Sequence, residues 1–372
     1  MLNFEFLKRA GLIAVVAGLG VVLPGCGKKE ERSESNTQNS KLVMPARGIY
    51  TGAYIDWGDK EDSVTLEGIE NFEKMVGKHQ AIVASSSYWG EQTFPEANMR
   101  LIANHGSVPL VFWSPWAPPY IEENHPPDKY SLTSIIAGEH DAYIDMWGKK
   151  AHEFGRPMIV SFANEMNGTW FPWSGVHYGA DKVIPDTNPP RFEGPETFKK
   201  AYRHVVDRVR AQGANNVQWV LHLMNYSLPQ EKWNLAAQYY PGREYCDWLG
   251  FSLYGVQTSD DEWAPYFPLL DWPYEELRRI DATKPVMICE WGVAELPQLG
   301  SKPDWIRDAF RYMKDPRYPN IKACVFWHER WQNEDGRYSN LRVNSTPESL
   351  EAYRKGVADP YFLGEPIFSH GK

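Results

Sequence analysis

Eight short runs of aliphatic, β-branched and aromatic residues alternate with helical patterns along most of this 372-residue chain. Most of the runs are apolar almost throughout, as expected for strands of a parallel sheet that is covered on both faces. The predicted strands are Gly48–Ile55, Gln80–Ser85, Val108–Trp113, Pro157–Phe162, Val217–His222, Trp248–Tyr254, Pro285–Glu290 and Ile321–Trp327. The helical patterns between them include Leu66–Gly77, Pro95–Gly106, Asp141–Gly155, Glu196–Gly213 and Asp304–Lys314, several of which stop at a glycine.

Eight strand–helix units predict an α/β fold of the (β/α)8 TIM-barrel type, as a single domain over residues 45–372. A last helix is expected after Thr346, which can cap it, with Pro347 in its first turn. No repeat of fixed period and no second domain is visible. A doubly wound open sheet is the alternative architecture.

The N-terminal segment is set apart from the barrel. Lys8 and Arg9 precede an apolar run that is shorter than the roughly 20 residues of a membrane-spanning helix. The run ends in Leu23-Pro24-Gly25-Cys26, which resembles a bacterial lipoprotein box. We therefore predict a signal peptide over 1–26, lipidation at Cys26, a disordered tether over 27–44 and export to a bacterial membrane. An ordinary signal peptide, which would give a periplasmic or secreted protein, is the alternative.

Composition narrows the class of partner. A net charge of −9 argues against nucleic acid, and 16 tryptophans with 20 tyrosines suggest carbohydrate contacts. Cys246, Cys289 and Cys324 are irregularly spaced, which favours three buried thiols over a Cys289–Cys324 disulfide. The histidines lack metal-ligand spacing, so no metal or other cofactor is predicted. We expect a monomer.

Two glutamates follow strands on the same rim of the predicted barrel. Glu165 stands in "SFANEMNGTWFPWSG" after the fourth strand, and Glu290 ends the seventh in "PVMICEWG". Hydrolysis of a glycoside uses such a pair, one carboxyl giving a proton to the leaving oxygen and the other attacking the anomeric carbon. If Glu290 faces the barrel axis, strict alternation places Ile288 inward and Cys289 toward the helices. Glu329, two residues past Trp327, is the alternative second carboxylate.

The motifs around these residues resemble those of a known family. "FANEMNGTWFPW" is similar to the acid/base motif of glycoside hydrolase family 26, the β-mannanase family, and "ICEWG" to its nucleophile motif. "GAYIDWGD" and "RVNSTPESLEAYRKGVADPYF" also look familial, so the resemblance covers Gly48 to Phe362. It implies a retaining glycosidase that acts on polysaccharide without a cofactor, most directly an endo-β-1,4-mannanase.

The resemblance also implies roles for individual residues. Glu165 matches the general acid/base, Glu290 the nucleophile, and Tyr254 the tyrosine that hydrogen-bonds the nucleophile. Trp327 matches the indole under the sugar at the cleavage point, and Trp170 the tryptophan that shapes the neighbouring subsite. We expect donors such as Tyr254 to keep Glu290 ionised, and aromatic burial to raise the pKa of Glu165.

Further aromatic residues follow the second and third strands. Trp89, Trp113 and Trp116 are therefore predicted as additional sugar platforms. Asn164 departs from the histidine that family mannanases usually carry before the acid/base. An asparagine there is expected to read the sugar 2-hydroxyl, which leaves mixed-linkage β-glucan or xylan as alternative substrates. A carbohydrate-binding lipoprotein without activity is the alternative from another class.

Overall fold

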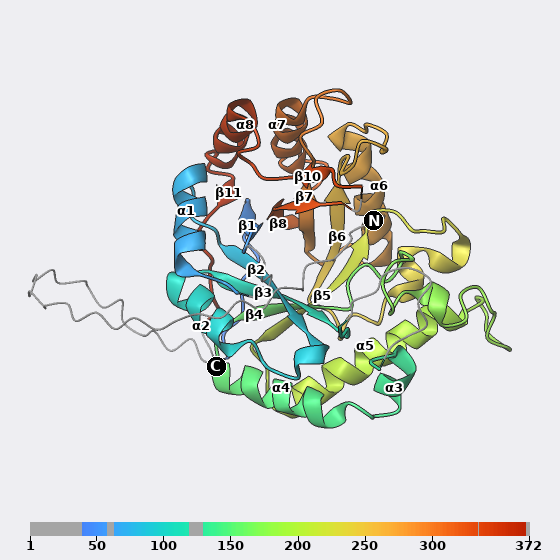
Figure 1. Cartoon of the computed structure of the whole chain (residues 1–372). Coiled ribbons are helices and arrows are strands. Elements are labelled where there is room, and N and C mark those ends of the chain that lie inside the picture. The colour runs from blue at the N-terminus through green and yellow to red at the C-terminus, as the bar shows by residue number, and fades with distance from the viewer. Residues whose placement is uncertain (1–38, 58–62, 119–128, 334, 370–372) are drawn as a thin grey trace, which may run out of the picture.

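The computed structural model describes residues 39–57, 63–118, 129–333 and 335–369. Eight parallel strands pair in sequence order, and β1 also pairs with β8, so the sheet closes on itself (Figure 1). Helices between the strands surround this barrel. The predicted (β/α)8 fold is confirmed. The signal segment, Cys26 and residues 27–38 of the tether lie outside the described residues and stay predictions. The prediction of disorder is wrong for the last residues of the tether, because Leu42 is buried, donates its N–H to Gln218 and pairs with Phe368.

The elements follow the predicted order with small shifts of their ends. The barrel strands are β1 (Ile49–Ile55), β2 (Ile82–Tyr88), β3 (Val108–Ser114), β4 (Met158–Phe162), β5 (Val217–Met224), β6 (Trp248–Tyr254), β7 (Val286–Gly292) and β8 (Ile321–His328). The helices are α1 (Leu66–Val76), α2 (Glu96–His105), α3 (Leu132–Ile136), α4 (Asp141–Phe154), α5 (Glu193–Ala211), α6 (Tyr266–Ile280), α7 (Lys302–Met313) and α8 (Pro347–Val357). A hairpin of β9 (Arg330–Gln332) and β10 (Tyr338–Asn340) follows β8, and β11 (Phe362–Leu363) pairs with β1.

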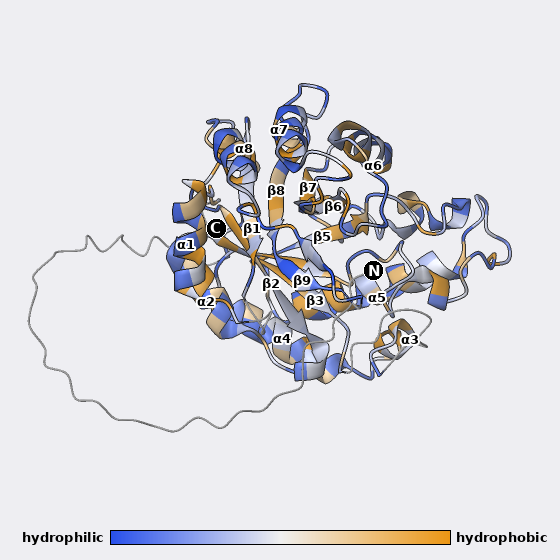
Figure 2. Cartoon of the chain, turned by 45° about the horizontal axis from the view of Figure 1, so that its top comes forward, coloured by the Kyte–Doolittle hydropathy of each residue, from blue (hydrophilic) through white to orange (hydrophobic). Residues whose placement is uncertain are grey.

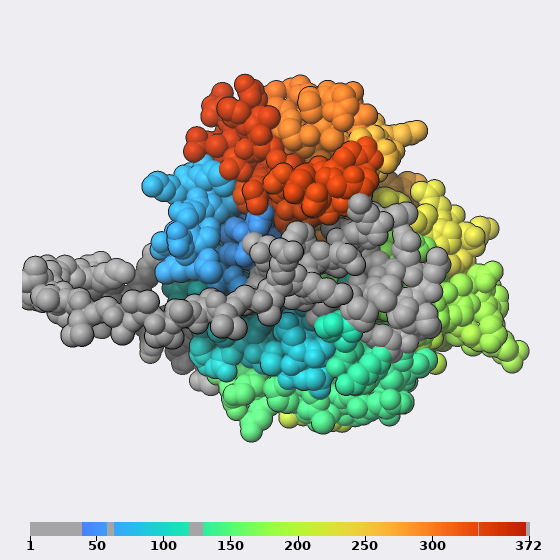
Figure 3. Space-filling view, viewed as in Figure 1, coloured from blue at the N-terminus to red at the C-terminus, as the bar shows by residue number. Residues whose placement is uncertain are grey.

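The expected cap of the last helix is present. The Thr346 hydroxyl accepts a hydrogen bond from the Ser349 backbone N–H, and Pro347 opens α8. The C-terminal segments lie against the N-terminal ones, as the orange to red atoms beside the blue atoms in Figure 3 show. The two ends of the barrel sequence therefore meet where the sheet closes.

The hydrophobic core has two parts because each strand is buried on both faces. One cluster fills the barrel interior with alternate residues of the strands, among them Tyr50, Ile82, Leu110 and Trp248. The other lies between the strands and the helices. Figure 2 shows orange strands inside a ring of helices whose outer faces are largely blue. Because the strands are parallel, their C-terminal ends lie on one rim, and packing on both faces of the sheet makes that rim rigid.

The alternation predicted for β7 is wrong at Cys289. Met287 and Cys289 pack inside the barrel, and the Sγ of Cys289 fills the space over Gly250 on β6. Ile288 packs toward the helices. The pairing of β7 with β6 and β8 shifts register after Ile288, so that Glu290 lies opposite Ser252. An irregularity of this kind re-aims a side chain without ending the strand.

The three cysteines within the described residues are free and buried, as predicted. Cys289 packs inside the barrel whereas Cys324 packs on its helix side. The two side chains therefore lie on opposite faces of the sheet, which explains why no bridge joins them. No helix in the described part of the chain is long and apolar enough to cross a membrane.

A carboxylate between two imidazoles joins α1 to α2 at the other end of the barrel. Glu73 accepts hydrogen bonds from His79 at 2.8 Å, His105 at 2.9 Å and the backbone N–H of Gln80 at 2.9 Å. Burial alone would raise the pKa of Glu73, but these hydrogen bonds outweigh it and lower the pKa. The hydrogen bond to Glu73 raises the pKa of His79. Both shifts mean that the ion pair stabilises the fold.

We expect Glu73→Gln to lower the free energy of unfolding by about 1–2 kcal/mol. The contribution of the carboxylate is present above its ordinary pKa of 4.5 and is lost as pH falls through the lowered one. The contribution of His79 is present below 6.5 and is lost as pH rises through the raised pKa. Denaturant unfolding between pH 4.5 and pH 6.5 should show the largest difference in the free energy of unfolding between this variant and the wild type. Glu70→Gln, an exposed change on the same helix, is the control, and an equal effect of both variants at all pH values would contradict the prediction.

Candidate active site

Glu165 is held by an irregular turn directly after β4. Ala163 and Glu165 have φ angles of 50° and 56°, a region that residues other than glycine rarely adopt. Tertiary contacts hold this backbone: the N–H of Glu165 donates to the His222 carbonyl on β5 at 2.7 Å, and the Trp173 indole donates to the Asn164 carbonyl at 2.7 Å. The strained turn directs the carboxyl group to the mouth of the barrel rather than toward the helices.

Glu290 reaches the same place from β7. Its Oε2 accepts a 2.7 Å hydrogen bond from the Tyr254 hydroxyl at the end of β6. One oxygen of Glu165, one of Glu290 and a ring nitrogen of His222 all lie within 4.8 Å of one another. Both glutamate side chains are buried. The structure therefore brings together the two carboxyl groups that the sequence separated by 125 positions.

The two carboxyl groups disfavour each other's ionisation. Burial raises the pKa of Glu165 and outweighs the donors Ser252 and Trp170. Burial, followed by the charge of Glu165, raises the pKa of Glu290 well above its usual range despite the Tyr254 hydroxyl. The Tyr254 hydroxyl favours the ionised form of Glu290, as expected, but burial and the charge of Glu165 outweigh it. Two buried carboxyls this close retain one proton between them, and the short Tyr254 hydrogen bond favours the anion on Glu290.

Two of the predicted aromatic residues donate hydrogen bonds to glutamates on this rim. Trp170 donates its indole N–H to Glu165 Oε2 at 3.0 Å. Trp327, inside the barrel on β8, stacks on Tyr54 with ring centroids 3.9 Å apart. Its N–H donates to Glu329 Oε2 at 2.7 Å, so the carboxylate considered as an alternative to Glu290 is engaged with this indole.

The other predicted platforms differ from one another. Trp89 and Trp113 are fully buried in the cluster on the helix side, so their prediction as sugar platforms is wrong. Trp113 stacks on Trp147 of α4 and donates its N–H to Tyr143, because its position on β3 points outward. Trp116 is 4% exposed and packs edge-on against Phe171 and Trp173, and its role as a sugar platform stays a prediction.

The two asparagines that flank Glu165 in the sequence have different surroundings. Asn167 exchanges hydrogen bonds with the backbone of Met224, at 2.8 and 3.1 Å, and thereby ties the loop after β4 to the end of β5. Asn167 therefore holds the loop that carries Glu165. Asn164 is buried next to the acid, with 7% of its surface exposed.

Three polar residues below the pair were missed at the sequence level. Ser161 on β4, His222 on β5 and Ser252 on β6 face the barrel interior and bond to one another. Their signal was present, since each is a polar residue at an inward position of an otherwise apolar strand. That position becomes visible only once the strand phase is known.

Residues 121–267 match the model of glycosyl hydrolase family 26, and this segment contains both Glu165 and Tyr254. Over this part of the chain the sequence is similar to that family. It is 27% identical over 318 residues to endoglucanase H of Acetivibrio thermocellus, covering 83% of this chain and 30% of that protein. It is 23% identical to a β-1,3-xylanase of Vibrio sp, covering 62% of this chain and 50% of that protein. The chain thus spans about a third to a half of the length of these relatives.

Solved structures share the fold of this chain. The catalytic domain of an endo-β-1,4-mannanase from Bacillus sp. JAMB-750 matches with a TM-score of 0.59 at 20% identity, covering 89% of this chain and 95% of that one. An endo-β-1,4-mannanase of Cellulomonas fimi matches with a TM-score of 0.58 at 18% identity, covering 86% and 72%. At these identities the likeness supports the barrel architecture alone.

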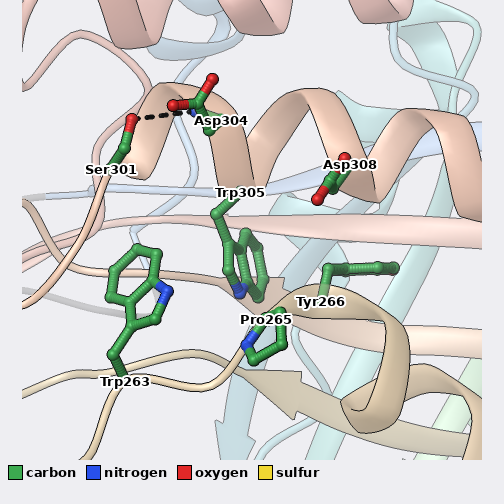
Figure 4. Close-up of a pocket in the computed structure, with 7 residues that line it drawn as sticks. All are labelled: Trp263, Pro265, Tyr266, Ser301, Asp304, Trp305 and Asp308. Carbon is green, nitrogen blue, oxygen red and sulfur yellow. Dashed lines mark hydrogen bonds between the residues drawn. The ribbon is translucent and has the colours of Figure 1, made fainter.

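A small cavity of about 120 Å³ lies apart from the paired glutamates of the barrel. The indoles of Trp263 and Trp305 face it from the loop after β6 and from α7 (Figure 4). The Trp263 ring occupies the place of a side chain at Gly300, where a Cβ would be 2.2 Å from the ring. Neither Glu165 nor Glu290 lines this cavity, so it is not the site of the chemistry.

The reassignment of Trp113 makes a stability prediction. We expect Trp113→Ala to lower the free energy of unfolding by about 3–5 kcal/mol, because it opens a cavity between β3 and α4. Trp272→Ala, at an indole that is 60% exposed, should change it little and serves as the control. Denaturant unfolding measures both. A loss of sugar affinity in Trp113→Phe at unchanged stability would instead support the prediction that Trp113 stacks on sugar.

Proposed function

We propose that this chain is a retaining glycoside hydrolase that cleaves β-linked polysaccharide. The observation that carries the proposal is the approach of Glu165 and Glu290, whose oxygens lie within 4.8 Å at the mouth of the barrel. Retaining enzymes hold their carboxyl groups about 5–5.5 Å apart, and inverting enzymes about 6.5–9.5 Å apart to admit a water. The pair lacks the room that an inverting mechanism needs.

The proposed reaction has two steps. The Glu290 carboxylate forms a bond to the anomeric carbon while the glycosidic C–O bond breaks and the proton of Glu165 passes to the leaving oxygen. Glu165, now an anion, then takes a proton from water, whose oxygen bonds to the anomeric carbon and releases Glu290. Because the pair holds one proton and the Tyr254 hydroxyl donates to Glu290, the first step starts with the proton on Glu165 and the negative charge on Glu290. The rate should therefore be bell-shaped with pH, with both limbs above the ordinary glutamate range.

β-1,4-Mannan is the first candidate substrate. The motifs around both glutamates are similar to those of the β-mannanase family, and two of the solved barrels named above are described as endo-β-1,4-mannanases. Indole faces such as that of Trp327 would stack on the sugar rings, and Tyr and Asn side chains would orient them.

A mixed-linkage β-glucan is the second candidate, favoured by one observation. Asn164 stands next to the acid where mannanases usually carry histidine, and mannose differs from glucose at the 2-hydroxyl that this position would read. The relative named endoglucanase H points the same way. Xylan follows behind both.

Sugar release from mannan, glucomannan, lichenan and xylan tests the proposal. We expect new reducing ends from one β-glycan and, by proton NMR, a first-formed product that retains the β-configuration. An α-anomer formed first would overturn the retaining mechanism. Binding to a glycan without release from any of the four would support the non-catalytic carbohydrate-binding alternative instead.

A further inference from the structure

Three buried side chains form a continuous line of hydrogen bonds beneath the carboxyl pair. The Ser161 Oγ lies 2.9 Å from His222 Nδ1, and the Ser252 Oγ lies 2.8 Å from His222 Nε2. All three are buried, with the His222 side chain fully enclosed. Ser252 pairs with Glu290 across the β6–β7 ladder, and its hydroxyl, acting as a donor, lowers the pKa values of both Glu290 and Glu165. The reaction described above uses none of these three residues.

Only one tautomer of His222 leaves the Ser252 hydroxyl free to donate to a carboxylate. Burial lowers the pKa of His222 to about 3, so the imidazole is neutral and offers one donor and one acceptor. If Nδ1 carried the hydrogen, Ser252 would spend its own hydrogen on Nε2 and turn lone pairs toward the carboxylates. With the hydrogen on Nε2, Ser161 donates to Nδ1, Nε2 donates to the Ser252 oxygen, and the Ser252 hydrogen remains for a carboxylate.

The same tautomer suits the position of Glu290. The His222 Nε2 lies 3.9 Å from Glu290 Oε1, so its N–H dipole favours an anion there. Ser252, however, has a single hydrogen and two carboxyl neighbours. It can donate to only one carboxylate at a time.

We propose that Ser252, oriented by His222 and Ser161, is a positioning residue whose hydroxyl hydrogen follows the negative charge between the two glutamates. It donates to Glu290 before the glycosyl-enzyme forms. When Glu290 has bonded to the sugar and Glu165 has given up its proton, the hydroxyl turns to Glu165. The movement is a rotation about one C–O bond, with no proton transferred. The inference rests on the proposed function for its meaning in the reaction, although the hydrogen bonding itself does not.

Other ionisable groups face the pair and bear on its titration. Burial raises the pKa values of Tyr254 and Cys289 well above their usual ranges, so both are neutral. Burial also raises the pKa of Tyr226. Glu329 adds negative charge from the loop after β8 and raises the pKa of Glu290. None of these four residues donates to both glutamates. Ser252 is therefore the donor that the two glutamates share.

Ser252→Ala tests the inference through kinetics. Loss of a hydrogen bond to an anion should slow glycosylation and deglycosylation each by about tenfold to a hundredfold. The acid limb of the pH profile should move to higher pH by about one pH unit, because the first carboxylate to ionise loses its donor. The alkaline limb should stay in place, because Ser252 can donate to only one of two carboxylates. Ser252→Thr, which keeps the hydroxyl, should restore the acid limb. Ser85→Ala, at a buried strand serine away from the pair, is the matched control.

Carbon-13 NMR of labelled glutamate provides a test without turnover. In Glu165→Gln, removal of the Ser252 hydroxyl should raise the pKa of Glu290, and in Glu290→Gln it should raise that of Glu165. A shift at only one of the two, or unchanged limbs in an active Ser252→Ala, would overturn the shared donor. If the wild type cleaves no glycan, the proposed function fails, while the NMR titrations still decide about Ser252.

Discussion

Glu290→Gln should lower kcat by about 10⁴-fold or more on any glycan that the wild type cleaves. The amide has the shape of the carboxylate but cannot form the ester bond with the anomeric carbon. The Tyr254 hydroxyl can still donate to the amide oxygen, so the local packing should persist. Stopped assays of reducing ends measure the rate, and calorimetry with an oligosaccharide measures binding, which we expect to remain.

Glu276→Gln is the matched control for this variant. Glu276 is a glutamate of α6 whose pKa burial raises, and it accepts a backbone hydrogen bond from Ala236, which a glutamine can also accept. We expect its kcat to equal that of the wild type. Full activity in Glu290→Gln would remove the nucleophile from the mechanism and direct attention to Glu329.

Glu165→Gln should have the second largest effect, and that effect should depend on the leaving group. We expect a loss of about 10²–10⁴-fold on polysaccharide, whose leaving oxygen needs a proton. An aryl glycoside with an acidic phenol leaves without that help, so its glycosylation should be almost unaffected and the glycosyl-enzyme should accumulate. Added azide, which needs no base, should then speed turnover.

The pH profile provides a further check on Glu165. The alkaline limb of the wild type reports loss of the one proton that the pair shares, and burial places this limb above the ordinary glutamate range. In Glu165→Gln that limb should vanish, while the acid limb should move to lower pH because Glu290 no longer faces a second carboxylate. An equal loss on all leaving groups with both limbs in place would show that Glu165 is not the acid.

The periodicity of the chain was enough to predict the barrel. Eight buried runs separated by helical patterns allow few arrangements, and parallel strands carry their C-terminal ends to one rim. Glu165 and Glu290 could therefore be assigned to the same rim before any coordinates. Their motifs lie at strand ends, so recognising the end of the strand in the sequence also places the residue on the rim.

The direction of individual side chains depended on tertiary structure. Trp113 stands at the end of a strand, but its outward phase puts it against Trp147 rather than at the mouth of the barrel. Strict alternation failed in β7, because a register shift against its neighbours turns both Cys289 and Glu290 inward. A one-residue change of phase moves a side chain to the other face of a sheet, and single-sequence patterns do not reveal where it occurs.

The sequence by itself determined the closed barrel and the two carboxyl positions, because these follow from hydrophobic period and strand order. Tertiary structure alone decided the ionisation of the pair and the line from Ser161 through His222 to Ser252. Those features arise from desolvation and from contacts between neighbouring strands 30 to 61 residues apart in the chain. Such energies depend on distances that exist only once the sheet has closed.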